Sequence, residues 1–398
     1  MLVKVKNIIY RNLNFENTII ILSILFSKSL YYETFGDNKL IILLLGLAIS
    51  NILYKTYIKQ LFFSKKSILL YLFIIIIIFI NPNAKMSTSL VFTGLLTTSL
   101  WFTTIIPLSR FTKVFYNLVK FLMVASLFRY LFMLINVTSI FPDFISIEGD
   151  HYTNFVFFGI LEGEHTFLGL LRNNGLWWEP GAFQVIINLA FLLGLAFKRV
   201  SINDYFLFLI VIISTASTAG VFIFSLLSFI YFRDNINYKL ISIFVLLIVP
   251  VLFATSFYEI VIESKLNLEN GSASSRFNDA VVAIKMFLDY PFIGTGMGDI
   301  EILEKYTSKF SYGTGSNGLL LLLANLGISS FIIFTPLIFP GYLKGFNKKI
   351  DKIIVSLSLF LIFFTQNFTI MLIFSIMIFY GVKKYKLINF IESENEQN

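Results

Sequence analysis

Two polar stretches of the chain contain arginine and other polar residues that could bind an anionic substrate and act on it. The first stretch is Arg172-Asn-Asn-Gly-Leu-Trp-Trp-Glu179-Pro180. A guanidinium can bind a phosphate through two parallel hydrogen bonds, and a carboxylate can act as a general base. Pro180 suits the first position of a helix, whose N-terminus attracts anions. A structural interpretation also fits, in which Glu179 only caps the helix and Arg172 pairs with it or with lipid headgroups.

The second stretch contains another arginine, Arg276, followed by an amphipathic segment over 277–288 that we expect to be a helix on the membrane surface. Gly294 and Gly296 come after it, and glycine permits a positive φ or a close backbone approach to a ligand. Ser316 or Asn317 can then cap a helix that begins next. Helix N-termini and the two arginines Arg172 and Arg276 are therefore candidates to form one site for a diphosphate.

Four other residues are candidates for a functional site. Arg129 lies deep in an apolar segment, where an unsatisfied charge costs at least ~2.5 kcal/mol. We expect it to face an outer cavity or to make a buried contact between helices. His165 is a reserve candidate for the base, and it can equally be a bystander in its loop. Glu148 and Asp150 form a weak acidic pattern of the kind that binds metal in some transferases.

The composition predicts the elements that must hold these residues. Hydrophobic residues make up 57% of the 398 residues, and charged residues make up 14%. No soluble fold of this size hides so much apolar surface, so the chain is predicted to be an all-α polytopic membrane protein. The absence of cysteine excludes disulfides and thiol chemistry, and the two histidines are too few for a histidine-built metal site.

The apolar segments predict about twelve transmembrane helices in a single integral membrane domain over 1–398. Basic residues concentrate in alternate connectors, which places both termini in the cytoplasm and explains the net charge of +8 without a nucleic-acid partner. Two long loops, 141–179 and 259–316, are then extracytoplasmic. We expect helices at 17–32, 40–54, 67–81, 87–108, 115–140, 181–197, 205–217, 219–232, 240–258, 317–339, 353–366 and 368–382.

Four motifs on the predicted outer side carry a family resemblance. The run from Arg172 to Pro180 resembles the R-x-x-G-x-x-x-E-P signature of bacterial O-antigen and capsule polymerases of the Wzy type and of their ligase relatives. The other three are the turn 215–220, the stretch from Arg276 to Gly296, and Ser316-Asn317-Gly-Leu-Leu. Ligases usually have histidine where this chain has Ser316, so the departure favours a polymerase.

The resemblance implies glycosyl transfer between two polyprenyl-diphosphate-linked glycans at the outer face of the bacterial cytoplasmic membrane. Arg172 and Arg276 would stabilise the leaving diphosphate, Glu179 or His165 would be the base, and Arg129, Gly294, Gly296, Ser316 and Asn317 would bind substrate. No metal or other cofactor is expected. The implied partners are the lipid-linked donor and acceptor, membrane lipid and a regulator of chain length.

Two alternatives remain open from the sequence. One is a ligase-type transferase that uses a different acceptor. The other is a flippase or transporter of lipid-linked glycans, which would place ionisable groups near the bilayer midplane on broken helices. The polar residues concentrate in the two long loops instead, and this favours an enzyme of the outer face.

Overall fold

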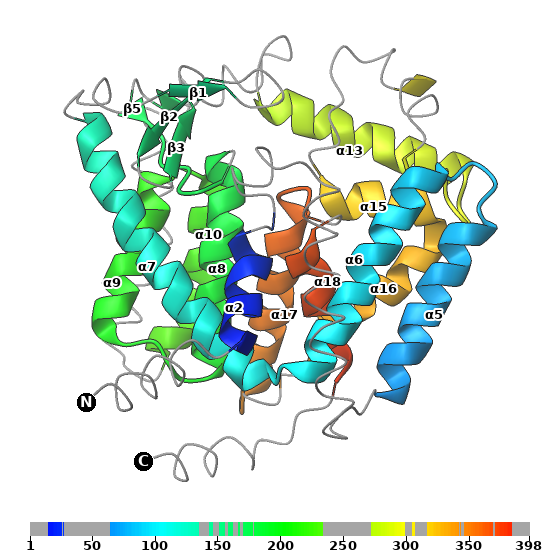
Figure 1. Ribbon diagram of the computed structural model, residues 1–398, viewed down its shortest axis with the longest axis horizontal. Coiled ribbons are helices and arrows are strands. Elements are labelled where there is room, and N and C mark those ends of the chain that lie inside the picture. The colour runs from blue at the N-terminus through cyan, green and yellow to red at the C-terminus, as the bar shows by residue number, and fades with distance from the viewer. Residues whose placement is uncertain are drawn as a thin grey trace. The chain divides into compact units, whose positions relative to one another are not determined.

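The fold is known from a computed structural model (Figure 1), which describes residues 15–25, 27, 64–134, 143–145, 151–155, 158–161, 166–167, 170–177, 179–233, 272–298, 305–306, 317–341, 343, 346–368 and 371–383. Three helical stretches there are long and apolar enough to cross a membrane, namely Met86–Ile105, Leu108–Phe132 and Gly318–Ile338. Shorter apolar helices accompany them. The chain is thus a membrane protein built on α-helices, whereas the total of twelve spans stays a prediction.

Most expected helices have a counterpart in the described part of the chain. The pairs expected within 205–232 and within 353–382 are each two helices, as predicted. The expected spans 40–54 and 240–258 lie outside the described residues. The helices are α2 (Phe15–Leu25), α5 (Lys65–Ile80), α6 (Met86–Ile105), α7 (Leu108–Leu134), α8 (Pro180–Ala196), α9 (Ile202–Ser214), α10 (Thr218–Phe232), α13 (Ser272–Asp289), α15 (Gly318–Leu326), the 3-10 turn η3 (Gly327–Ser329), α16 (Ser330–Ile338), α17 (Lys349–Phe364) and α18 (Leu372–Val382).

The first long loop adds short strands to this helical fold, which differs from the purely α-helical prediction. Strands β1 (Asp143–Ile145), β2 (His151–Phe155) and β3 (Phe158–Leu161) form an antiparallel sheet, and β4 (Thr166–Phe167) pairs with β5 (Leu170–Leu171). Each strand has at most five residues. Such short hairpins satisfy the backbone of a loop, and their local pattern is too brief to predict among long apolar segments.

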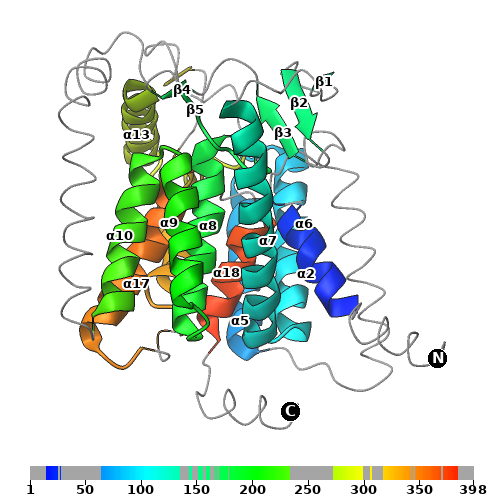
Figure 2. The ribbon, with the colours of Figure 1, turned by 90° about the vertical axis from the view of Figure 1, so that its left-hand side faces the viewer.

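The chain packs as two compact units, and α6 and α18 each contribute to both. The first comprises 1–64, 94–216 and 371–376. In it α7 packs against α2, α8 and α9, and Figure 2 shows β2 and β3 at the end where α7 finishes. Helix α8 is buried from Pro180 to Gly194. Its core includes Phe191, whose ring lies 5.2 Å from that of Phe208 on α9.

The second unit comprises 65–93, 217–370 and 377–398. In it α10 packs on α17, and α13 packs on α15. Figure 1 shows α13 running crosswise to α5. Val282, Ala283 and Met286 of α13 form a buried apolar cluster with Ala324 of α15. The amphipathic segment predicted over 277–288 is therefore a helix with one buried face.

Candidate functional site

The segment from Arg172 to Trp177 is fixed to two helices of the first unit, and Asn173 is its central anchor. The backbone N–H of Asn173 donates to the Ser214 carbonyl at 2.9 Å. Its Nδ2 donates to Ser126 Oγ of α7 at 3.2 Å and to Ser214 Oγ of α9 at 3.0 Å. Its Oδ1 accepts from the N–H of Gly175 at 3.0 Å. One buried amide thus joins the segment to both α7 and α9.

Arg172 lies beside this anchor and is half-buried. Its Nε donates to the carbonyl of Thr215, at a distance of 3.0 Å. Thr215 is the C-cap of α9, where the last carbonyls of a helix lack partners within the helix and carry partial negative charge. This contact directs the guanidinium along the end of α9.

Arg129 of α7 is completely buried and contacts the same segment. Its Nη1 donates to the Gly175 carbonyl, and its Nη2 donates to Asn174 Oδ1. Asn174 in turn donates from Nδ2 to the Trp177 carbonyl at 2.7 Å. Of the two roles left open by the sequence, the geometry matches a buried structural contact, made to a loop rather than to another helix.

Gly175 is required by the turn itself. Its φ is +57°, and a Cβ at this position would lie 2.7 Å from the ring of Phe183. That ring stacks on Trp177 with 5.4 Å between centroids. The Trp177 Nε1–H donates to the Ser27 carbonyl at 3.1 Å. Backbone and aromatic packing therefore hold the turn against α8 and against Ser27, two residues beyond the end of α2.

Glu179 is the N-cap residue of α8, and Pro180 follows at the first helical position, as predicted. The Glu179 side chain makes no capping hydrogen bond. It is half-buried at the helix start. Glu179 thus occupies the cap position without a capping hydrogen bond from its side chain, and the carboxylate remains a candidate for acid–base chemistry.

In the second unit, the turn containing Gly294 and Gly296 packs against the chain itself. The N–H of Thr295 donates to the Ala324 carbonyl at 2.9 Å, and that of Gly296 donates to the Asn325 carbonyl at 3.1 Å. A Cβ on Gly294 would lie 2.3 Å from the Asn325 backbone, and one on Gly296 would lie 2.7 Å from the Ala84 backbone. These contacts explain both glycines without a ligand.

Asn81 strengthens the same turn, and sequence analysis assigned it no role. Its Nδ2 donates to the carbonyls of Ile293 at 2.8 Å and Gly294 at 3.0 Å. The loop between α5 and α6 is therefore fastened to the predicted second loop. Neither the spacing nor the residue type of Asn81 could have revealed a contact with residues so distant in the sequence.

The remaining predicted site residues are placed only in part. Asn317 caps α15, and its Oδ1 accepts from the Leu320 N–H at 3.3 Å, which confirms one of the two expected caps. Arg276 lies on α13, but its side chain is outside the described part of the structure. His165 and Ser316 lie outside it as well. Within the described residues, no group of three His, Asp or Glu side chains could hold a metal ion.

Tyr306 and Asp289 form a hydrogen-bonded pair at the end of α13 that no sequence pattern predicted. The Tyr306 hydroxyl donates to Asp289 Oδ2. Burial and the adjacent Asp289 carboxylate raise the pKa of Tyr306 to about 12. The phenol therefore keeps its proton into the alkaline range and serves as a hydrogen-bond donor to the carboxylate.

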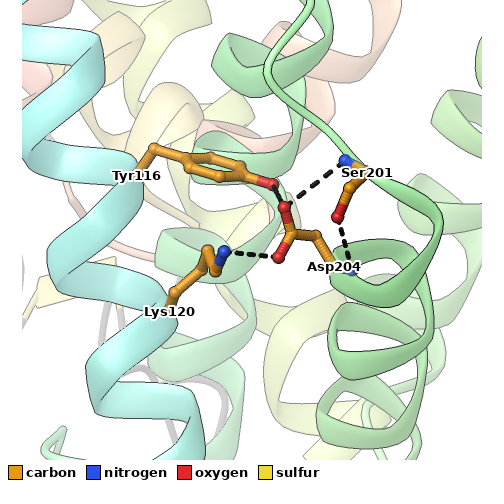
Figure 3. Close-up of polar contacts among 4 residues, drawn as sticks. All are labelled: Tyr116, Lys120, Ser201 and Asp204. Atoms are coloured by element: carbon orange, nitrogen blue, oxygen red, sulfur yellow. Dashed lines mark hydrogen bonds and ion pairs between the residues drawn. The ribbon is translucent and has the colours of Figure 1, made fainter.

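A second polar cluster joins α7 and α9 at the opposite end of α9 from Thr215 (Figure 3). Asp204 forms an ion pair with Lys120 and accepts a hydrogen bond from Tyr116 Oη at 3.0 Å. Ser201 and Asp204 also form a reciprocal capping box at the start of α9. The Ser-x-x-Asp spacing was a usable signal for the cap, but the partnership with Lys120 was not visible in the sequence.

Comparison with known proteins supports the resemblance over part of the chain. Residues 205–335 match the family model described as O-antigen ligase. This range contains Arg276, Gly294, Gly296, Ser316 and Asn317, whereas Arg129 and the stretch from Arg172 to Pro180 precede it. No curated protein matches the chain. Together with the apolar helices, the match indicates a membrane protein similar to enzymes of glycan assembly.

Proposed function

We propose that this chain is a polysaccharide polymerase that joins oligosaccharide repeat units carried on polyprenyl diphosphate, at the outer face of the bacterial cytoplasmic membrane. The match of residues 205–335 to O-antigen ligases is the observation that carries this proposal. Both kinds of enzyme transfer a glycan from a lipid diphosphate, so the match supports the reaction class. Ser316, in place of the histidine usual in ligases, favours the polymerase.

The first unit supplies groups suited to the transfer. The bond between sugar and phosphate breaks as the acceptor hydroxyl attacks, and negative charge develops on the departing diphosphate. Arg172, whose direction is set by Thr215, is suited to stabilise that charge. Glu179, at the start of α8 and without a capping bond, is suited to accept the proton of the hydroxyl. The positive end of the α8 dipole adds to the attraction for an anion.

Arg276 stays a second candidate for stabilising the leaving diphosphate, as the family resemblance implies. It lies on α13, within the second loop 259–316 that the charge distribution predicts to be outside. Gly294 and Gly296 enter the proposal as residues that shape the adjoining turn. His165 stays the reserve base, and Ser316 and Asn317 stay candidate substrate contacts at the start of α15.

The experiment uses the purified full chain in proteoliposomes with polyprenyl-diphosphate-linked repeat units. A polymerase yields a ladder of products that differ by one repeat unit, and Glu179→Gln removes the ladder. A ligase-type enzyme instead yields a single transfer, and only after a different acceptor glycan is added. Movement of intact substrate across the bilayer without new glycosidic bonds would contradict the proposal and support a transporter.

A further inference from the structure

We propose that Arg129 is a positioning residue for Arg172. In this proposal Arg129 never touches substrate. It fixes the backbone that follows Arg172, so that the Arg172 guanidinium is presented to a diphosphate in one orientation. The inference depends on the proposed function for the role of Arg172, but the anchoring itself can be tested separately.

The burial of Arg129 argues against contact with substrate. The whole residue is inaccessible, with 0% of its surface exposed. It lies within Leu108–Phe132, a helix long and apolar enough to cross a membrane. A guanidinium in that environment persists when its donors are satisfied by the protein. Here two of its nitrogens bind acceptors on Gly175 and Asn174.

Both acceptors lie within three residues of Arg172 along the chain. The Asn174 side chain is also held at Nδ2, which donates to the Trp177 carbonyl. Asn173, directly after Arg172, is held from the other sides by Ser126 and Ser214. The backbone on the C-terminal side of Arg172 is thus immobilised, and the contact of its Nε with Thr215 completes the restraint.

The chemistry explains why this position requires arginine. A planar guanidinium can donate to a carbonyl and to an amide oxygen at once, through a fixed fork. A lysine ammonium at the same site would be a point charge on a flexible stem, and it would leave one buried acceptor without its donor. Arg129→Lys therefore keeps the charge while it releases the segment.

A double-mutant cycle on ligand binding separates positioning from direct contact. The probe is undecaprenyl diphosphate, bound to the full chain in nanodiscs, and the variants are R129K, R172K and the double variant. We expect each single change to weaken binding by about tenfold or more. R172K loses the two-point fork on the diphosphate, whereas R129K leaves the fork in place but releases the backbone that orients it. The double variant should bind no more weakly than R172K alone, because Arg129 acts only through Arg172.

Arg110→Lys is the matched control, since Arg110 lies on the same helix but at its opposite end. There it pairs with Glu16 at 2.5 Å and contacts Asn17. This variant should bind the probe as the native chain does. Should R129K fail to fold, Asn174→Ala replaces it, because it removes one of the two acceptors and leaves Arg129 in place. Multiplicative losses in the double variant, or full binding by the folded R129K protein, would overturn the inference.

Tryptic cleavage after Arg172 gives a readout that needs no ligand. In the native chain the bond between Arg172 and the buried Asn173 should be protected. Cleavage there, followed by mass spectrometry, should become faster in R129K and stay slow in R110K. If the native chain does not bind the probe, or if R172K binds it normally, the proposed function fails. Unchanged protection in R129K, in contrast, refutes the anchoring by Arg129.

Discussion

At the scale of single residues, three arginines of the first unit show how surroundings decide a role. Arg110 forms an ion pair with Glu16, at 2.5 Å. Arg129 is fully buried and donates to Gly175 and Asn174 in the loop before α8. Arg172 is half-buried at the end of α9. Arg110 and Arg172 are both half-buried and held by the protein, but of these two only Arg172 belongs to the polar stretch proposed to bind the diphosphate. It is therefore the residue for which substitution should affect chemistry most directly.

Arg172→Lys should reduce polymer formation by at least about tenfold at an unchanged protein level, because lysine keeps the charge but lacks the two-point fork that matches a phosphate. The measurement is product length and yield in the proteoliposome assay. Arg110→Lys provides the comparison for a conservative change on an arginine of the same unit. Normal polymer in R172K would speak against a contact between Arg172 and the diphosphate.

Gly175→Ala should destabilise the first unit. Its φ of +57° disfavours any side chain, and the new Cβ would meet the Phe183 ring at 2.7 Å. Together, backbone strain and overpacking are expected to cost roughly 2–4 kcal/mol. Thermal unfolding in detergent measures the loss. In a Phe183→Ala background the steric clash is relieved, so Gly175→Ala should cost less than in the native chain but still lose the part due to backbone strain. No loss at all in that background would show that the φ angle does not matter.

At the scale of elements, an ion pair joins two helices in each unit. Lys120 of α7 pairs with Asp204 of α9, and Arg233 at the end of α10 pairs with Asp351 of α17. Charges so close to apolar helices cost free energy when they lose their partner, so each pair favours one registration of its two helices. In the first unit, the Lys120–Asp204 pair joins α7 to the start of α9, and Asn173 joins α7 to the end of α9.

Asp204→Asn should therefore destabilise the first unit by about 1–2 kcal/mol, a value reduced from that of a fully buried pair because Lys120 is partly exposed. The melting temperature in detergent is the measurement. Adding Lys120→Met should recover part of the loss, since no unpaired charge remains. Ser201→Ala tests the cap alone and should cost about 1 kcal/mol. An Asp204→Asn protein as stable as the native one would show that the pair contributes nothing.

At the scale of the whole molecule, sidedness decides whether the proposed site is accessible to lipid-linked glycans. The charge distribution predicts that the connectors that follow α7 and precede α15 lie outside. These two connectors are the long loops 141–179 and 259–316. The proposed function requires both to lie on one side of the membrane.

The native chain has no cysteine, which makes this arrangement directly testable. Single cysteines at Ser146 and Ser308 should react with a membrane-impermeant maleimide in intact spheroplasts. A cysteine at Lys348, in a connector predicted to be cytoplasmic, should react only after permeabilisation. Protection of Ser146→Cys or Ser308→Cys in intact cells would refute the predicted topology.

Sequence alone determined the features that depend on neighbouring residues. Long apolar segments predicted a helical membrane protein, and the described helices from α5 to α10 and from α15 to α18 lie close to the expected ranges. Local signals also located helix starts at Pro180 and Asn317. Such predictions succeed because apolar runs and caps act over a few residues, and the membrane requires every span to satisfy its own backbone.

Tertiary structure decided the roles that depend on distant partners. Arg129 is a candidate for several functions by type, and only its contacts with Gly175 and Asn174 show that it anchors a loop. Gly294 and Gly296 were candidates for ligand contact, and the chain itself occupies the space beside them. The physical reason is the same in each case. A buried polar group bonds to whichever partner the fold brings near, and the spacing of residues in the sequence does not reveal which distant residues become neighbours.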